Sequence, residues 1–260
     1  MKSYRVTYNT TLLTGALVAQ KVLSFGYFWY LSNQLSAGTL GRYLFALSFA
    51  SLFGIGTDLG LTPLLIREAA RDRELGQRYL PNVLGLKLLL SLVVIAAGSI
   101  ATHFSGKPLD VRLMIYAALG FVVFDAFTLS AWGMFKAARN LWYESCSTLV
   151  VQITIIILGV TILNTTRLTF HLVLSLVAAS AVNFGLAVWL LRRRLGYRLT
   201  PKWEPKTLRT LIHMAPAFAA SLVFTKIYNV ADVVLLGYLA DDVAVAHYAV
   251  PAKVVTSLQQ

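Results

Sequence analysis

Charged side chains inside long apolar runs are the residues of this sequence best placed to do chemistry. Lys21, Asp58, Asp125, Lys226 and Asp232 each lie within such a run. A charge at the centre of a bilayer costs about 2.5–3.5 kcal/mol on insertion scales, so it is retained where it faces other helices or a wet cavity. Lysines in a cavity bind anionic groups, and aspartates neutralise lysines or bind cations. We therefore take these five as the candidate substrate-binding residues.

Helical periodicity adds hydroxyl groups to the same faces. Thr14 shares a helix face with Lys21, and Thr62 shares one with Asp58. A narrow polar stripe on an otherwise apolar helix is typical of helices that line a central cavity. Serine and threonine in spanning helices also pack closely or bond the backbone, which is the simpler explanation for any one of them.

Two alternatives for the charged residues stay open. Asp58 and Asp125 could be structural partners that neutralise Lys21 or Lys226 and bind no substrate. Lys87 lies near the expected inner end of its span, and we expect its side chain to snorkel to the membrane surface.

The elements that must position these residues are membrane-spanning helices. The 260 residues are 57% hydrophobic and only 13% charged, and the mean hydropathy is +0.68. Soluble domains have about 25% charged residues. We expect an all-α, polytopic transmembrane helix bundle. Seven spans are expected at Thr10–Ser32, Arg42–Ile66, Pro81–Phe104, Arg112–Phe135, Glu144–Leu163, Thr169–Leu191 and Leu211–Gly237, and an eighth begins near Val243. Gly54, Gly56 and Gly60, followed by Pro63, should kink or break the second span, or else allow close packing of neighbouring helices.

The loops predict orientation and domain organisation. Most of the 23 lysines and arginines fall on one side of the expected spans, which places the N-terminus in the cytoplasm. The basic stretch 192–210 reads as a cytoplasmic linker between a six-helix lobe, 1–191, and the start of a truncated second lobe, 211–260. A constant shift pairs Lys21 with Lys226 and Tyr43 with Tyr248, which favours two pseudo-symmetric lobes.

Several function classes are disfavoured. The net charge of +12 does not indicate a nucleic-acid-binding protein, because the cations lie in short breaks between apolar runs. The sequence has no GxSxG, HExxH or P-loop motif, so we expect no enzyme and no bound cofactor. Cys146 is the single cysteine and the four histidines are scattered, so we expect no metal site.

Several motifs resemble those of the polysaccharide transporter family, within the multidrug/oligosaccharidyl-lipid/polysaccharide flippase superfamily. Family members tend to begin the second helix with Leu-Gly-x-Tyr/Phe, followed by Asp-x-Gly and then Arg-Glu. The matching residues here are Leu40, Gly41, Tyr43, Asp58, Gly60, Arg67 and Glu68. The segment Asn229–Gly237, followed by Tyr248, Ala252 and Lys253, resembles the seventh helix and its junction with the eighth.

This resemblance implies a flippase in the cell inner membrane that moves polyprenyl-pyrophosphate-linked oligosaccharides outward for O-antigen, lipopolysaccharide or exopolysaccharide synthesis. Lys21 and Lys226 would bind the phosphates, and Asp58 and Asp232 would be neutralisers or cation sites. The implied partners are the lipid-linked oligosaccharide, membrane lipids, a polysaccharide polymerase and glycosyltransferases. The coupling ion, if one exists, is left open between Na⁺ and H⁺. Alternatives are a cation-coupled multidrug antiporter of the same superfamily, a membrane-embedded glycosyltransferase or ligase, and a membrane subunit without transport activity.

Overall fold

The protein folds as an all-α bundle, as predicted. The computed structural model describes residues 2–166, 168–197 and 199–259. These residues form helices and connecting turns, with no strand among them. In chain order the elements are α1 (Lys2–Gln34), α2 (Ala37–Gly54), η1 (Ile55–Thr57), α3 (Leu61–Arg71), α4 (Arg73–His103), α5 (Leu109–Ala137), α6 (Trp142–Thr165), α7 (Thr169–Leu190), η2 (Leu191–Leu195), α8 (Pro205–Met214), α9 (Pro216–Leu239) and α10 (Asp242–Gln259).

Six segments of the described chain are long and apolar enough to cross a membrane, which makes this a multi-pass membrane protein. They are Ala37–Thr57, Arg73–His103, Leu109–Ala137, Trp142–Thr165, Thr169–Leu195 and Pro216–Leu239. These segments correspond to the second through seventh expected spans. The helix of the first expected span, α1, has 33 residues and is long enough, but polar residues such as Lys21 lower its hydropathy and it is not among the six.

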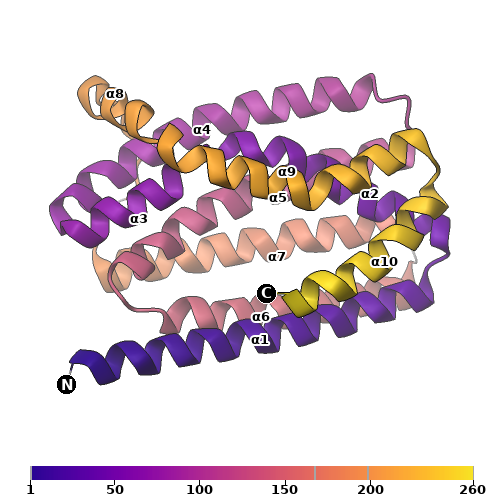
Figure 1. Ribbon diagram of the computed structural model, residues 1–260, viewed down its shortest axis with the longest axis horizontal. Coiled ribbons are helices and arrows are strands. Elements are labelled where there is room, and N and C mark those ends of the chain that lie inside the picture. Colours follow the sequence, from indigo (N-terminus) through magenta and orange to yellow (C-terminus); the bar gives the residue numbers. More distant parts are fainter. Residues whose placement is uncertain (1, 167, 198, 260) are drawn as a thin grey trace.

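The long helices lie side by side along the longest axis of the molecule (Figure 1). Helix α5 packs against both α2 and α7, and α1 packs against α6. One end of the bundle carries α3, α8 and the amino terminus, and the other carries the turns that join α1 to α2 and α9 to α10 (Figure 1). We call these the inner end and the outer end, following the orientation expected from the basic loops.

The second expected span is broken, as its glycines predict. Helix α2 ends at Gly54, a single 3₁₀ turn follows, and α3 starts at Leu61. Gly60 has φ +82°, a left-handed conformation that favours glycine. A Cβ there would also lie 2.6 Å from the carbonyl oxygen of Ala215 at the start of α9. The break therefore combines a special backbone geometry with a close approach of α9.

The third expected span starts earlier than predicted. Pro81 was expected to begin this helix, but α4 begins at Arg73, where the Asp72 side chain accepts a hydrogen bond from the Glu74 amide. The prediction was wrong because it took the start of the apolar run as the start of the helix, whereas the Asp72 N-cap initiates the helix before that run. Pro81 lies inside α4, and its carbonyl accepts a hydrogen bond of 3.0 Å from the Lys202 amide.

Two hydrophobic clusters fill the bundle, and the charged residues fall between them along the chain. One cluster contains Phe53 at its edge and Val122, and the other contains Leu61 and Ala131. Asp58 and Asp125 therefore follow residues of one cluster and precede residues of the other. A charge buried beside such apolar residues needs a partner.

Candidate functional site

Asp58 lies in the break between α2 and α3, where backbone groups have no helical partners. Its carboxylate accepts a hydrogen bond of 3.2 Å from the Thr62 amide and one of 2.5 Å from the Thr62 hydroxyl. The side chain therefore caps the first turn of α3, which is the usual role of an aspartate at a helix start. Its remaining carboxylate surface faces α4.

Lys87 on α4 meets that carboxylate. Its side chain has no exposed surface, and its Nζ lies 2.5 Å from Oδ1 of Asp58, 2.8 Å from Oγ1 of Thr62 and 2.7 Å from the carbonyl oxygen of Ala126 on α5. An ammonium group has three protons, so three oxygens satisfy it completely. The Thr62 hydroxyl is also 3.2 Å from the Ser130 hydroxyl on α5. This arrangement holds α3, α4 and α5 together through one lysine.

The expectation that Lys87 snorkels is therefore wrong. It assumed a span beginning at Pro81, which would put Lys87 within two turns of the surface. Because α4 begins at Arg73, Lys87 lies about 21 Å along the helix, at 1.5 Å per residue. At that depth an internal carboxylate is a better partner than distant water.

Asp125 and Lys226 extend this arrangement. Electrostatic interactions connect Lys87 with Asp125 and with Lys226, and connect Asp125 with Lys226. Asp125 is partly buried on α5, whereas Lys226 is exposed on α9. We call Asp58, Lys87, Asp125 and Lys226 the charge cluster. Its two carboxylates and two ammonium groups balance in formal charge, and its most accessible member is a cation.

The other two candidate residues lie apart from the charge cluster. Lys21 is half-buried on α1, whose main neighbour is α6. The carboxylate of Asp232 accepts hydrogen bonds from the Tyr248 hydroxyl on α10 and from the Val233 amide. Asp232 therefore links α9 to α10. Three of the five candidates, Asp58, Asp125 and Lys226, come together, and Asp58 pairs with Lys87 rather than with Lys21 or Lys226.

A second group of charges lies at the outer end, and sequence reasoning missed it as a unit. Arg42 on α2 contacts two carboxylates, Oδ2 of Asp242 at 2.9 Å and Oδ2 of Asp110 at 3.0 Å. Lys107 reaches Oδ1 of Asp242 at 4.0 Å and donates a hydrogen bond to the Gly237 carbonyl. We call Arg42, Lys107, Asp110 and Asp242 the outer ion-pair cluster. It ties α9 and α10 to α2 and to the start of α5.

A glycine makes this contact possible. A Cβ on Gly41 would lie 1.7 Å from the carbonyl oxygen of Asp242, far inside any real contact distance. Helices α2 and α10 therefore approach closely only because this position lacks a side chain. The only signal in the sequence was the presence of charged residues at several helix ends, which does not say which ends meet.

Comparisons with solved structures define the class of fold. An inward-facing multidrug resistance transporter of the MATE family, in the MOP superfamily, aligns with a TM-score of 0.59 at 14% identity, over 92% of this chain and 58% of its own. The MATE multidrug transporter DinF-BH, solved as a complex, aligns with 0.60 at 16% identity, over 97% and 60%. A MOP superfamily transporter from Pyrococcus furiosus gives 0.54 at 13% identity, over 98% and 64%. The chain has the fold of MOP superfamily transporters and spans less than two thirds of each of these proteins.

Comparison of the sequence with models of protein families identifies the family. Residues 6–260 match the model of the polysaccharide biosynthesis protein family. The chain belongs to this family, which confirms the resemblance carried by its motifs. No curated protein sequence matches it significantly.

Proposed function

We propose that the chain is part of a flippase that moves polyprenyl-pyrophosphate-linked oligosaccharide repeat units from the cytoplasmic to the outer leaflet, for surface polysaccharide synthesis. Membership of the polysaccharide biosynthesis family supports the pathway, and the fold supports transport. The observation that carries the proposal is the exposed cation Lys226 on α9, the most accessible member of the charge cluster, which includes Asp58 in the helix break. A pyrophosphate is anionic and its glycan is polar, so neither crosses hydrocarbon unaided.

The members of the charge cluster would have different roles. Lys87 is fully satisfied by three oxygens, so it holds the broken helix against α4 and α5. Lys226 is exposed, and its nearby carboxylate, Asp125, balances it when no substrate is bound. A phosphate entering from the inner end would replace Asp125 as the anionic partner of Lys226, because it is the stronger anion. Lys21 on α1 is a second cation that a long substrate could reach.

Transport would follow from rocking of the lobe 1–191 against the lobe that begins at 211, with 192–210 as the linker. The outer ion-pair cluster connects the two across α2 and α10, through the contact between Arg42 and Asp242. Release of substrate to the outer leaflet would require this contact to part. Because Arg42 is partly exposed, the pair is weak enough to open and close.

The orientation, location and partners belong to the same proposal. The inner end carries the basic loops, so the N-terminus would lie in the cytoplasm of a cell with this protein in its inner membrane. Glycosyltransferases would act on the oligosaccharide before flipping, and a polymerase would act on it after flipping. The protein itself would move its substrate without changing a covalent bond.

A cation-coupled multidrug antiporter is the alternative that the fold favours. In that case Asp125, a partly buried carboxylate, would bind Na⁺, H⁺ or a cationic substrate. A membrane subunit without transport activity would need neither residue. Efflux of a hydrophobic cation that depends on Asp125 and not on Lys226 would favour the antiporter.

The test replaces Lys226 in the native gene and measures surface polysaccharide together with lipid-linked oligosaccharide in the inner leaflet. We expect Lys226→Ala to abolish surface polysaccharide and to accumulate the lipid-linked precursor, whereas Lys226→Arg keeps most activity because the charge is conserved. Lys202→Ala is the control, because it removes an exposed cation from the linker. Normal polysaccharide in a well-expressed Lys226→Ala strain would reject the assignment.

A further inference from the structure

The short helix α8 has one buried face and one basic face. Thr207 and Leu211 are buried, and α8 contacts α4 and α3 on that side. The opposite face carries Lys206, Arg209 and His213, all exposed. These residues are spaced three and four apart, which aligns them along one side of a helix. The helix is thus anchored to the bundle by one face and presents a row of cations on the other.

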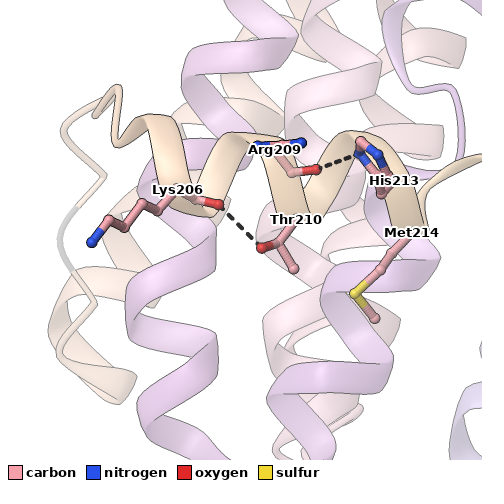
Figure 2. Close-up of a pocket in the computed structure, with 5 residues that line it drawn as sticks. All are labelled: Lys206, Arg209, Thr210, His213 and Met214. Atoms are coloured by element: carbon pink, nitrogen blue, oxygen red, sulfur yellow. Dashed lines mark hydrogen bonds between the residues drawn. The ribbon is translucent and has the colours of Figure 1, made fainter.

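This basic face is hollowed into a shallow groove of about 430 Å³. Its lining residues are Lys206, Arg209, Thr210, His213 and Met214, shown as sticks in Figure 2. The Thr210 hydroxyl donates to the Lys206 carbonyl, and His213 Nδ1 lies 3.0 Å from the Arg209 carbonyl (Figure 2). Both contacts are internal to α8, and the charged ends of Lys206 and Arg209 stay free of them.

None of the five residues that line the groove is a carboxylate. The nearest acidic residue along the chain, Glu204, accepts a hydrogen bond of 2.9 Å from the Thr207 hydroxyl and contacts Nε of Arg78 at 3.4 Å. Its carboxylate is therefore paired with Thr207 and Arg78 and does not line the groove. A groove lined by two permanent cations and no anion is suited to a phosphate group.

The surroundings of the groove favour a phosphate at a membrane surface over one in solution. Ile212 is 55% exposed and Trp203 is 51% exposed, one on α8 itself and one just before it. Exposed aromatic and aliphatic side chains next to cations are typical of helices that lie in the headgroup region. Nearby in sequence, Arg193 stacks over the half-exposed ring of Trp189 at 5.2 Å.

We propose that the groove on α8 binds the phosphate headgroups of anionic phospholipids in the leaflet at the inner end of the bundle. Lys206 and Arg209 bind the phosphate, and Ile212 inserts among the glycerol and acyl chain ends. The exposed edge of Trp203, whose ring packs against Gly85 of α4, borders the same lipid. A single residue, Ala215, separates the end of α8 at Met214 from the start of α9 at Pro216. A bound lipid therefore fixes the membrane depth of the start of α9, the helix that carries Lys226.

The test measures binding of short-chain phosphatidylglycerol, and of short-chain phosphatidylcholine as the reference, to the purified protein in detergent. We compare Lys206→Ser/Arg209→Ser with Arg71→Ser/Arg192→Ser, which removes two exposed cations from the same end of the bundle. At about 1 kcal/mol per basic residue, the α8 double variant should lose about 30-fold in affinity for phosphatidylglycerol. The control pair should lose less than about threefold, because surface charge alone acts diffusely.

Three results would overturn the proposal. Equal losses in both double variants would mean diffuse attraction without a site on α8. Equal binding to both lipids by the unmodified protein would exclude an anionic headgroup. Displacement of the lipid by inorganic phosphate at low millimolar concentration would identify a soluble anion as the ligand. The charge-conserving pair Lys206→Arg/Arg209→Lys checks folding and should bind normally. None of these readouts involves transport, so their outcome is separate from that of the proposed function.

Discussion

Replacing Lys87 with alanine should destabilise the protein by about 3 kcal/mol or more. The substitution leaves the Asp58 carboxylate, 21% exposed, without its cation and removes one of the donors to the Ala126 carbonyl. Removing one partner of a buried ion pair costs about 3–5 kcal/mol because the remaining charge is uncompensated. Asp58 keeps its hydrogen bonds from Thr62 and some contact with solvent, which places the expected loss at the lower end.

A double substitution separates this electrostatic cost from the loss of packing. In Lys87→Met/Asp58→Leu both charges are gone and the volume is largely kept. The Thr62 amide and hydroxyl lose the Asp58 acceptor, but the hydroxyl keeps its contact with Ser130. We expect the double variant to lose about 1–2 kcal/mol, less than Lys87→Ala alone. Lys21→Ala is the matched control, because this lysine is half-buried on α1 and lies outside the charge cluster.

The assay is unfolding of the purified protein in detergent, followed by tryptophan fluorescence with increasing denaturant. The reasoning predicts the order wild type, then Lys21→Ala, then the double variant, then Lys87→Ala. The account of Lys87 as a structural ion pair is refuted if Lys87→Ala costs less than about 1 kcal/mol, or if the double variant is less stable than Lys87→Ala.

Three further predictions concern the outer end and the linker. Arg42→Gln removes both contacts of a 43% exposed guanidinium, so stability should fall by about 1 kcal/mol or less while thiol labelling of a cysteine introduced at Val243, next to Asp242, becomes faster. Gly41→Ala places a Cβ on the Asp242 carbonyl, so it should cost about 1–3 kcal/mol in denaturant unfolding, and an unchanged midpoint would disprove the close approach of α2 and α10. The hydrogen bond from Thr207 lowers the pKa of Glu204, so its contribution is complete above the ordinary glutamate pKa and is lost as pH falls through the lowered one. Amide exchange at the start of α8 should therefore accelerate in acid relative to Glu204→Gln, and parallel pH profiles would contradict this.

The spanning helices could be predicted from the sequence because their signal is local. Long apolar runs specify helices in lipid whatever they pack against. The break near Asp58 was one of two interpretations that Gly54, Gly56 and Gly60 allowed, the other being close helix packing, and the structure shows the break. The start of α4 was predicted too late, because the prediction followed the beginning of the apolar run at Pro81 and did not take the Asp72 N-cap into account.

The pairings within the site could not be predicted, because they depend on how separate helices pack. Asp58 and Lys87 meet only because α3 and α4 lie against each other. The partners Arg42 and Asp242 are 200 residues apart along the chain. The cost of a buried charge predicted that each needs a partner, but not which one.

Accessibility of position 226 is the most direct test of the central claim, that Lys226 lines an aqueous route for an anionic substrate. Lys226→Cys in a Cys146→Ser background provides a single thiol, since Cys146 is the only native cysteine. In sealed membranes a charged, membrane-impermeant thiol reagent should label this position. Labelling only by an apolar reagent would show that position 226 faces acyl chains and would contradict the account.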